Sequence, residues 1–108
     1  MYAEQGGNLD VALQLAQVAK EQLPELPDVN DTLGWVYYKK DLAQLAVGPL
    51  TLAIERDGSN PVFRYHLGLV HMKNGDLDLA KDALESALKI KPDFDGAADA
   101  RKILAMLR

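Results

Sequence analysis

The chain has 108 residues, of which 48% are hydrophobic and 26% charged, a balance typical of one folded domain that buries a modest core without disulfide or metal crosslinks. Its 12 Lys and Arg against 16 Asp and Glu give a net charge of -4 with both signs interspersed, which argues against nucleic-acid binding because that function needs a basic face. The absence of cysteine excludes a disulfide framework and a cysteine-ligated zinc site, and no apolar run approaches the roughly 20 residues of a membrane span, so we expect no membrane insertion by this segment.

Six helices are predicted from the hydrophobic periodicity and from the turn signals between them. The turn signals are QGGN at 5–8, LPELP at 23–27, GSNP at 58–61, NGD at 74–76 and KPD at 91–93. They place helices near 9–22, 28–40, 43–57, 62–74, 77–90 and 95–107. No segment keeps the two-residue period of a strand over a useful length, so the predicted fold class is all-α.

Residues of the helix expected at 9–22 recur 34 and 68 positions later in the following helix pairs. Small residues, leucines and helix terminators keep this spacing: Ala12 with Ala46 and Ala80, Ala19 with Ala53 and Ala87, Leu33 with Leu67, Gly34 with Gly68, and Pro24 with Pro92 at twice the interval. Such a period predicts a stack of similar helix pairs.

Gly34 lies inside the helix expected at 28–40, where a glycine costs about 1 kcal/mol relative to alanine. We expect it to face Ala46 and Ala53 of the next helix, so that the two backbones approach toward the short end of the usual ~8–10 Å spacing. Close packing would then offset the cost of the glycine. The same relation is expected between Gly68 and the alanines of helix 77–90, Ala80 and Ala87.

Two residues of the second pair predict local backbone features. Asp41 stands between the helices expected at 28–40 and 43–57, and an aspartate tolerates the left-handed conformation that such a turn often needs. Pro49 follows Gly48 inside helix 43–57 and removes the hydrogen bond to the carbonyl of Leu45, so a kink is expected there.

These positions together resemble the tetratricopeptide repeat. The middle repeat carries Leu33, Gly34, Tyr37, Ala46, Leu50 and Ala53, and the third carries Leu67, Gly68, Ala80, Leu84, Ala87 and Pro92. The resemblance covers nearly the whole chain and implies a superhelix, an α-solenoid, of antiparallel helix pairs with about six helices. The sequence departs from the family pattern at the usual tryptophan position, which holds Asn30 and Arg64, and at the tyrosine position of the third repeat, which holds His71.

The repeat register divides a single domain, residues 1–108, into four parts. They are a partial repeat at 1–26, repeats at 27–60 and 61–94, and a C-terminal capping helix at 95–108 with the polar outer face that repeat arrays need for solubility. Residues 1–5 match only the end of a first helix, so we expect an excerpt from a longer repeat protein.

A narrower likeness concerns three stretches, DTLGWVYYKK, NPVFRYHLGL and KPDFDGAADARKIL. They resemble bacterial repeat proteins associated with the PEP-CTERM exosortase and exopolysaccharide system. That resemblance implies an envelope-associated parent protein, whereas the composition itself fits the cytoplasm equally well.

No residue pattern predicts catalysis, a metal site or a cofactor. His66 and His71 are five positions apart, so they point about 140° away from each other around a helix, and His71 is interpreted as a substitute for a packing tyrosine. Asp76 and Asp78 fit a helix N-terminus, where negative charge is favoured. No nucleophile has a base beside it, so the chain is not expected to be an enzyme.

A second stripe on each first helix is the candidate functional feature. Trp35 and Tyr38 point about 130° away from the side of the helix that carries Gly34. The resemblance implies that this stripe lines a concave face where such arrays bind peptides. The candidate residues are Asp28, Asp31, Trp35, Tyr38, Lys39, Val62, Tyr65, Leu69, Met72 and Lys73.

The predicted function is a non-catalytic scaffold that binds a peptide or helical segment of a protein partner on this face. Asp31, Thr32, Trp35, Val62 and His66 stand where one variant of the family carries basic and asparagine residues that grip a C-terminal carboxylate, so an apolar ligand is expected instead. Two alternatives stay open. The stripe can be ordinary packing between repeats, or the chain can be a structural or self-associating end of a longer array.

Overall fold

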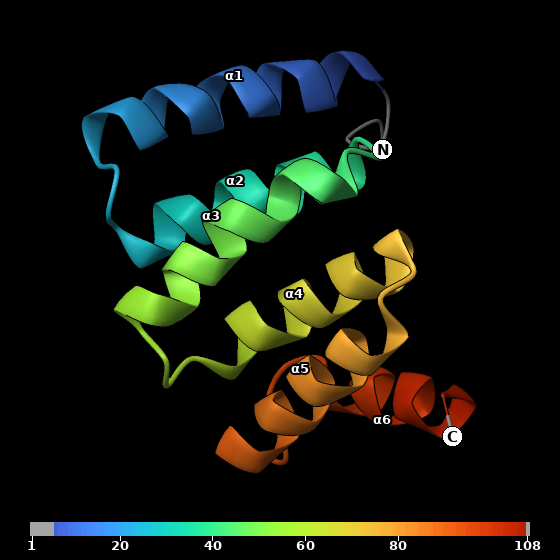
Figure 1. The fold of residues 1–108 in the computed structure, drawn as a ribbon. Helices are drawn as coiled ribbons and strands as arrows, with labels where there is room; N and C mark the ends of the chain where they lie inside the picture. The colour runs from blue at the N-terminus through green and yellow to red at the C-terminus, as the bar shows by residue number, and fades with distance from the viewer. Residues whose placement is uncertain (1–5, 108) are drawn as a thin grey trace.

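Six helices follow one another in the computed structural model, which describes residues 6–107 (Figure 1). They are α1 (Gly6–Gln22), α2 (Pro27–Lys39), α3 (Ala43–Arg56), α4 (Pro61–Asn74), α5 (Leu77–Ile90) and α6 (Ala97–Met106). Residues 6–107 contain no strand, so the all-α prediction is confirmed. The expectation that residues 1–5 end a repeat's first helix lies outside the described residues.

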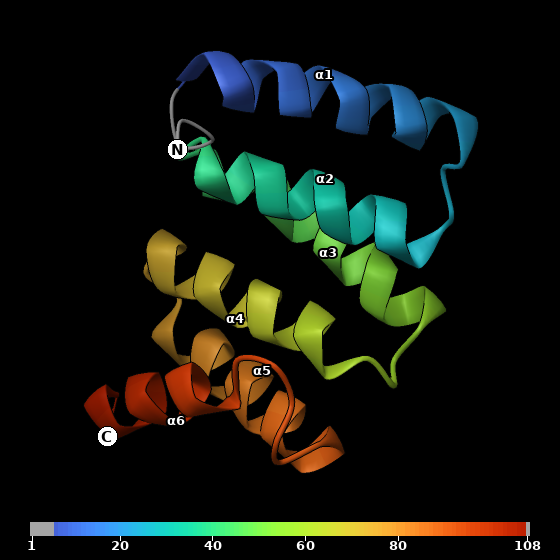
Figure 2. The same ribbon diagram turned by 180° about the vertical axis from the view of Figure 1, so that it is seen from behind.

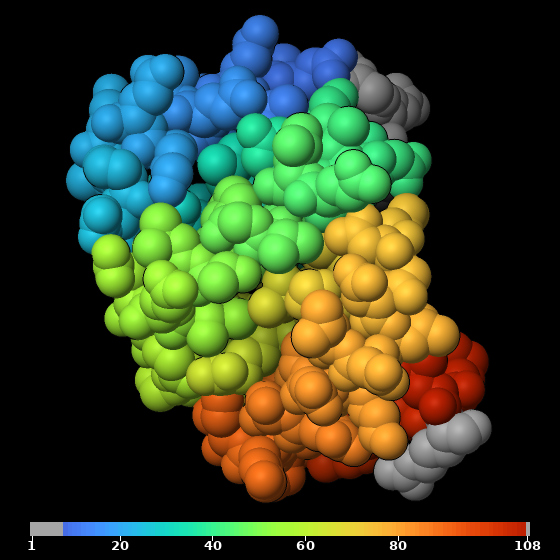
Figure 3. Space-filling model, in the orientation of Figure 1, coloured from blue at the N-terminus to red at the C-terminus, as the bar shows by residue number. Residues whose placement is uncertain are grey.

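The helices form an elongated stack of 37 × 28 × 24 Å in which each helix packs on its neighbours in the sequence. Helices α2 and α3 form one antiparallel pair, α4 and α5 form the next, and α3 packs on α4 to join them. Figure 2 shows α2, α4 and α6 on the face opposite to α3 and α5, with α2 and α4 running in the same direction. The opposite face, in Figure 3, shows successive helices as bands in chain order.

Two predicted boundaries are wrong. The QGGN stretch was expected to be a turn, but α1 already begins at Gly6. The last helix was expected from residue 95, but α6 begins at Ala97, because Gly96 adopts a φ of 113° that ends the preceding turn. Proline marks the starts of α2 and α4 at Pro27 and Pro61, where its fixed φ suits the first helical position.

Gly34 and Gly68 are buried where two leucines fill the space above them. A Cβ on Gly34 would lie 2.6 Å from Leu50 Cγ, and one on Gly68 would lie 2.7 Å from Leu84 Cδ2. Both leucines have no exposed surface. The predicted close approach is therefore present, but a leucine of the partner helix is the nearest contact, rather than the alanines that the sequence suggested.

The turns and departures from the repeat pattern also have structural reasons. Asp41 has a φ of 63°, as predicted, and Gly75 has a φ of 83° at the position 34 residues later. Buried Asn30 donates from Nδ2 to the carbonyls of Pro24 and Leu26, at 3.1 and 3.0 Å, and its Oδ1 accepts from Lys20 Nζ at 2.6 Å. At the position of the family's tryptophan, a polar side chain thus closes the turn before the helix through its hydrogen bonds.

Arg64 plays the same role one repeat later, where its Nη2 donates to the carbonyl of Gly58 at 3.1 Å. Pro49 lies inside α3, which continues from Ala43 to Arg56. Gly48 precedes Pro49, and the absence of a Cβ relieves the clash with the proline ring that disfavours helical conformation at that position.

Replacement of Gly34 by alanine is expected to lower the free energy of unfolding, although alanine is the better helix former by about 1 kcal/mol. The new Cβ would overpack against Leu50, and overpacking costs about 1–3 kcal/mol. The matched control is a Leu50→Ala background, which opens the space. There, Gly34→Ala should stabilise the fold by about 1 kcal/mol, measured by urea denaturation. Equal effects in both backgrounds would contradict the proposed contact.

A second prediction concerns the dependence of stability on pH, through His71. It is buried as expected of a packing residue, and its Nδ1 has no hydrogen-bond partner within residues 6–107. Burial lowers the pKa of His71 below 6.5, while Asp76 acts weakly in the opposite direction. The unfolded chain therefore binds more protons below pH ~6.5, and stability should fall as the pH drops through this range. His71→Tyr should remove that part of the pH dependence, and identical profiles for both proteins would contradict it.

Candidate functional site

Five stacked or tilted rings cross the face formed by α2, α4 and the turn before α6. This aromatic row consists of Tyr38, Trp35, His66, Tyr65 and Phe94, in that order. From Tyr38 the successive ring centroids are 5.0, 4.0, 5.9 and 5.6 Å apart. Such distances are those of favourable aromatic pairs, so the row joins the two helix pairs and the C-terminal turn into one surface.

The centre of the row is fixed by a side-chain pair between α2 and α4. His66 Nδ1 lies 2.7 Å from Asp31 Oδ1, and both side chains are largely buried, with exposures of 14% and 16%. This contact orients the imidazole against Trp35, whose ring is 4.0 Å away and nearly parallel, at 21°. The carboxylate of Asp31 is therefore already paired within the chain, and this pairing holds the central ring of the row in place.

The far end of the row is covered by the C-terminal turn and α6. Tyr65 Oη donates a hydrogen bond of 2.5 Å to Asp99 Oδ2, and the Tyr65 ring packs beside buried Phe94. Gly96 permits this approach, since a Cβ there would lie 2.8 Å from Tyr65 Cε2. Burial, and then the carboxylate of Asp99, raise the pKa of Tyr65, so the hydroxyl stays protonated and donates.

Two lysines lie at the open end of the row. Lys39 Nζ is 5.6 Å from the ring centroid of Trp35, and Lys73 Nζ is 5.5 Å from that of Tyr38. Lys73 also pairs with Asp41 Oδ1 at 2.9 Å, and this contact raises the pKa of Lys73. No carboxylate within residues 6–107 forms an ion pair with Lys39. Since α2 and α4 run in the same direction, both charges gather at one end of the face.

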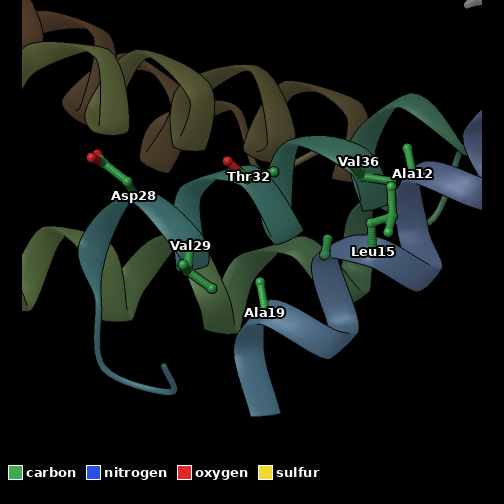
Figure 4. A pocket seen from close by; sticks show the side chains of 8 residues that line it. Ala12, Leu15, Ala19, Asp28, Val29, Thr32 and Val36 are labelled. Carbon is green, nitrogen blue, oxygen red and sulfur yellow. The ribbon is translucent and has the colours of Figure 1, made fainter. Parts of the chain in front are cut away.

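The remaining four predicted residues are not members of the aromatic row. Asp28 is exposed and lines a cavity between α1 and α2, away from the rings (Figure 4). Val62 is partly buried and packs against the core formed by α5, the turn that follows it and α6. Leu69 and Met72 are partly buried on α4. The structure thus brings together Asp31, Trp35, Tyr38, Lys39, Tyr65 and Lys73 among the predicted residues.

Three members of the site were missed from the sequence. His66 was weighed as a metal ligand, although the family resemblance had already set it among the positions where one variant grips a carboxylate, which was a signal that it faces α2. Phe94 is the last residue of the repeat at 61–94, and Asp99 lies one 34-residue period after Tyr65, but neither belongs to the stripe predicted on the first helices. Within residues 6–107 no cluster of three potential metal ligands occurs, and none of the helices there is long and apolar enough to cross a bilayer.

Comparison with known proteins agrees with this architecture. Residues 63–94 match the family model described as Tetratricopeptide repeat. The first TPR domain of the human RPAP3 protein, solved by NMR, superposes with a TM-score of 0.84 at 19% identity over 98% of this chain and 83% of that chain. The chain has the tetratricopeptide-repeat fold. The predicted superhelix of helix pairs is therefore confirmed.

A second structure with the tetratricopeptide-repeat fold is similar to the same degree. PcrH, in a crystal structure with the chaperone binding region of PopD, superposes with a TM-score of 0.84 at 23% identity over 97% of this chain and 82% of that chain. No curated protein sequence matches the chain. None of the comparisons supports the narrower resemblance to exosortase-associated bacterial proteins.

The Tyr65 contact predicts how α6 is held. Tyr65→Phe removes one hydrogen bond to a carboxylate but keeps the ring, so we expect a loss of about 1 kcal/mol in stability and faster amide exchange in α6. Tyr38→Phe is the matched control, because the Tyr38 hydroxyl makes no hydrogen bond within the described residues. Equal exchange in α6 for both variants would mean that the hydroxyl does not hold the helix.

Proposed function

We propose that the chain is a non-catalytic scaffold whose α2–α4–α6 face binds a segment of a protein partner along the aromatic row. The fold supports this role, since PcrH with the same fold is described in complex with a region of PopD. The aromatic row supports the location proposed for the binding site. It offers ring edges for apolar side chains and two cations at one end, which is a set of groups suited to non-covalent recognition.

The observation that carries the proposal is the pairing of Lys39 with the face of Trp35. An ammonium 5.6 Å from an indole is attracted to the ring yet keeps its charge available, because no carboxylate within residues 6–107 neutralises it. A partner segment with an aliphatic side chain against Trp35 and Tyr38 and a carboxylate near Lys39 would satisfy both groups. Asp31, a candidate residue from the sequence, has no part in this proposal, because its carboxylate is paired with His66.

The stacking of the rings limits how a ligand can contact them. Trp35 has His66 on one side at 4.0 Å and Tyr38 at 5.0 Å, so a ligand reaches ring edges rather than a free indole face. This also divides the role of Trp35 between partner binding and packing of α2 on α4. Trp35→Ala is consequently a poor single test, since it removes the contact with His66 as well.

The structural alternative, in which the row is covered by its own chain or by another copy, has partial support at one end only. Asp99 and Phe94 cover Tyr65, whereas Tyr38 and Trp35 lie beyond α6 and keep partial exposure. The proposed binding site is accordingly the half of the row on α2 with the two lysines.

The test selects peptides from a random phage-displayed library against the whole chain and measures their affinity by the fluorescence of Trp35, the only tryptophan. Selected peptides should share an acidic residue beside an aliphatic one. Lys39→Glu should weaken them about tenfold or more, because repulsion replaces attraction. Lys89→Glu in the last turn of α5 is the matched control and should change nothing. Peptides that bind Lys39→Glu and the parent chain equally would refute this site.

A further inference from the structure

The turn between α2 and α3 places a carboxylate where the next repeat has a glycine. Asp41 has a φ of 63° and is the only residue other than glycine within residues 6–107 that adopts a positive φ. The residue 34 positions later is Gly75, with a φ of 83°. Glycine adopts this conformation without the steric cost that a Cβ brings, so the backbone alone does not account for an aspartate here. The feature that the aspartate adds to the turn is its carboxylate.

This carboxylate contacts one of the two lysines at the open end of the aromatic row. Asp41 Oδ1 lies 2.9 Å from Lys73 Nζ at the end of α4, and the same ammonium lies 5.5 Å from the centroid of the Tyr38 ring. Lys39 lies beside the neighbouring ring of Trp35 and has no carboxylate partner within residues 6–107. The two cations thus lie against adjacent stacked rings, and the described part of the chain neutralises one of them.

The Asp41–Lys73 pair is exposed enough to exchange partners. The side chain of Lys73 is 49% exposed and that of Asp41 is 77% exposed, whereas the side chains of the Asp31–His66 pair are 14% and 16% exposed. An ion pair between exposed side chains contributes little to stability, because water solvates both charges when the pair opens. A carboxylate from outside the chain can therefore replace Asp41 at small cost.

The surface beside Lys73 has room for a second carboxylate. Lys73 and Asp41 line a hollow of about 600 Å³ that is bordered by Leu42 and Leu45 around the start of α3. The ammonium therefore faces this hollow as well as the ring of Tyr38. A ligand that lies along the ring edges can present an acidic side chain to Lys73 from the hollow without displacing a helix.

We propose that Asp41 is an internal competitor for an acidic group of the ligand, and that the partner segment carries two acidic residues. This inference rests on the function proposed for the aromatic row. One acidic residue of the segment pairs with Lys39, and the other displaces Asp41 from Lys73. A segment already held at Lys39 presents its second carboxylate at a high effective concentration, whereas a free anion has to compete with a carboxylate that belongs to the chain. Asp41 thereby makes the position at Lys73 selective for a group that a bound segment delivers.

The first test needs no ligand and uses acetic anhydride as a probe of the Lys73 amine. Only the unprotonated amine is acetylated, and the contact with Asp41 raises the pKa of Lys73. Asp41→Asn should therefore speed the acetylation of Lys73 about twofold or more, measured by mass spectrometry of peptide fragments. Asparagine tolerates the left-handed conformation of the turn, so the variant keeps the fold. Lys89 in the last turn of α5 is the internal reference, and its rate should stay the same.

The second test uses the peptides selected from the phage-displayed library as probes. In each peptide every acidic residue is replaced in turn by its amide, and the affinities are measured by the fluorescence of Trp35. One replacement should weaken binding about twofold in the parent chain and about fivefold in Asp41→Asn, where the internal competitor is absent. The same replacement should have no effect in Lys73→Gln. Glu85→Gln neutralises an exposed carboxylate of α5, is the matched control and should behave as the parent chain.

Acetylation of Lys73 at the same rate in the parent chain and in Asp41→Asn would overturn the inference. Peptides that Lys39→Glu weakens, but whose acidic replacements act equally in both chains, would overturn it and leave the proposed function intact. A library that yields no peptide weakened by Lys39→Glu would refute the proposed function and the inference with it. Faster acetylation together with the larger effect of one acidic residue in Asp41→Asn would support the competition.

Discussion

The contact of a leucine with a glycine on the facing helix is the constraint from which the rest of the structure follows. Leu50 over Gly34 and Leu84 over Gly68 set the closeness of the two antiparallel pairs. Because a buried leucine cannot move aside without opening a void, the rotation of each first helix about its axis is fixed too. That rotation turns Trp35 and Tyr65 toward the opposite side, where their rings meet His66 between them.

The aromatic row therefore has a structural role besides the recognition role proposed for it. Its rings join α2, α4 and the C-terminal turn, and its lysines lie against the rings of Trp35 and Tyr38. Each pair interaction of this kind is worth about 0.5–1.5 kcal/mol, so several in series add to the core that α3 shares with Val70 of α4 in holding the pairs in register. A partner that contacts the row would meet a surface whose side chains already have fixed orientations.

Much of the fold could be predicted from the sequence because the 34-residue period repeats both packing and turn residues. Asp41 illustrates this, since its left-handed φ was predicted from its place in the period. Contacts between different repeats were not predictable in the same way. The Asp31–His66 pair joins residues 35 positions apart, and the Tyr65–Asp99 pair joins residues 34 positions apart, on α4 and the capping helix α6. Helical spacing predicts on which side of a helix a side chain lies. Whether side chains of two helices contact each other depends also on the angle between the helices.

The closure of the first turn has a further consequence for the cavity between α1 and α2. Lys20 of α1 donates at once to Asn30 of α2 and to the carbonyl of Pro24, so one ammonium bridges both walls at their connected end. The two helices cannot separate there without breaking these hydrogen bonds. The ammonium of Lys20 therefore anchors the end of α1 to the start of α2, and a substitution of this one lysine would loosen the connected end of the cavity first.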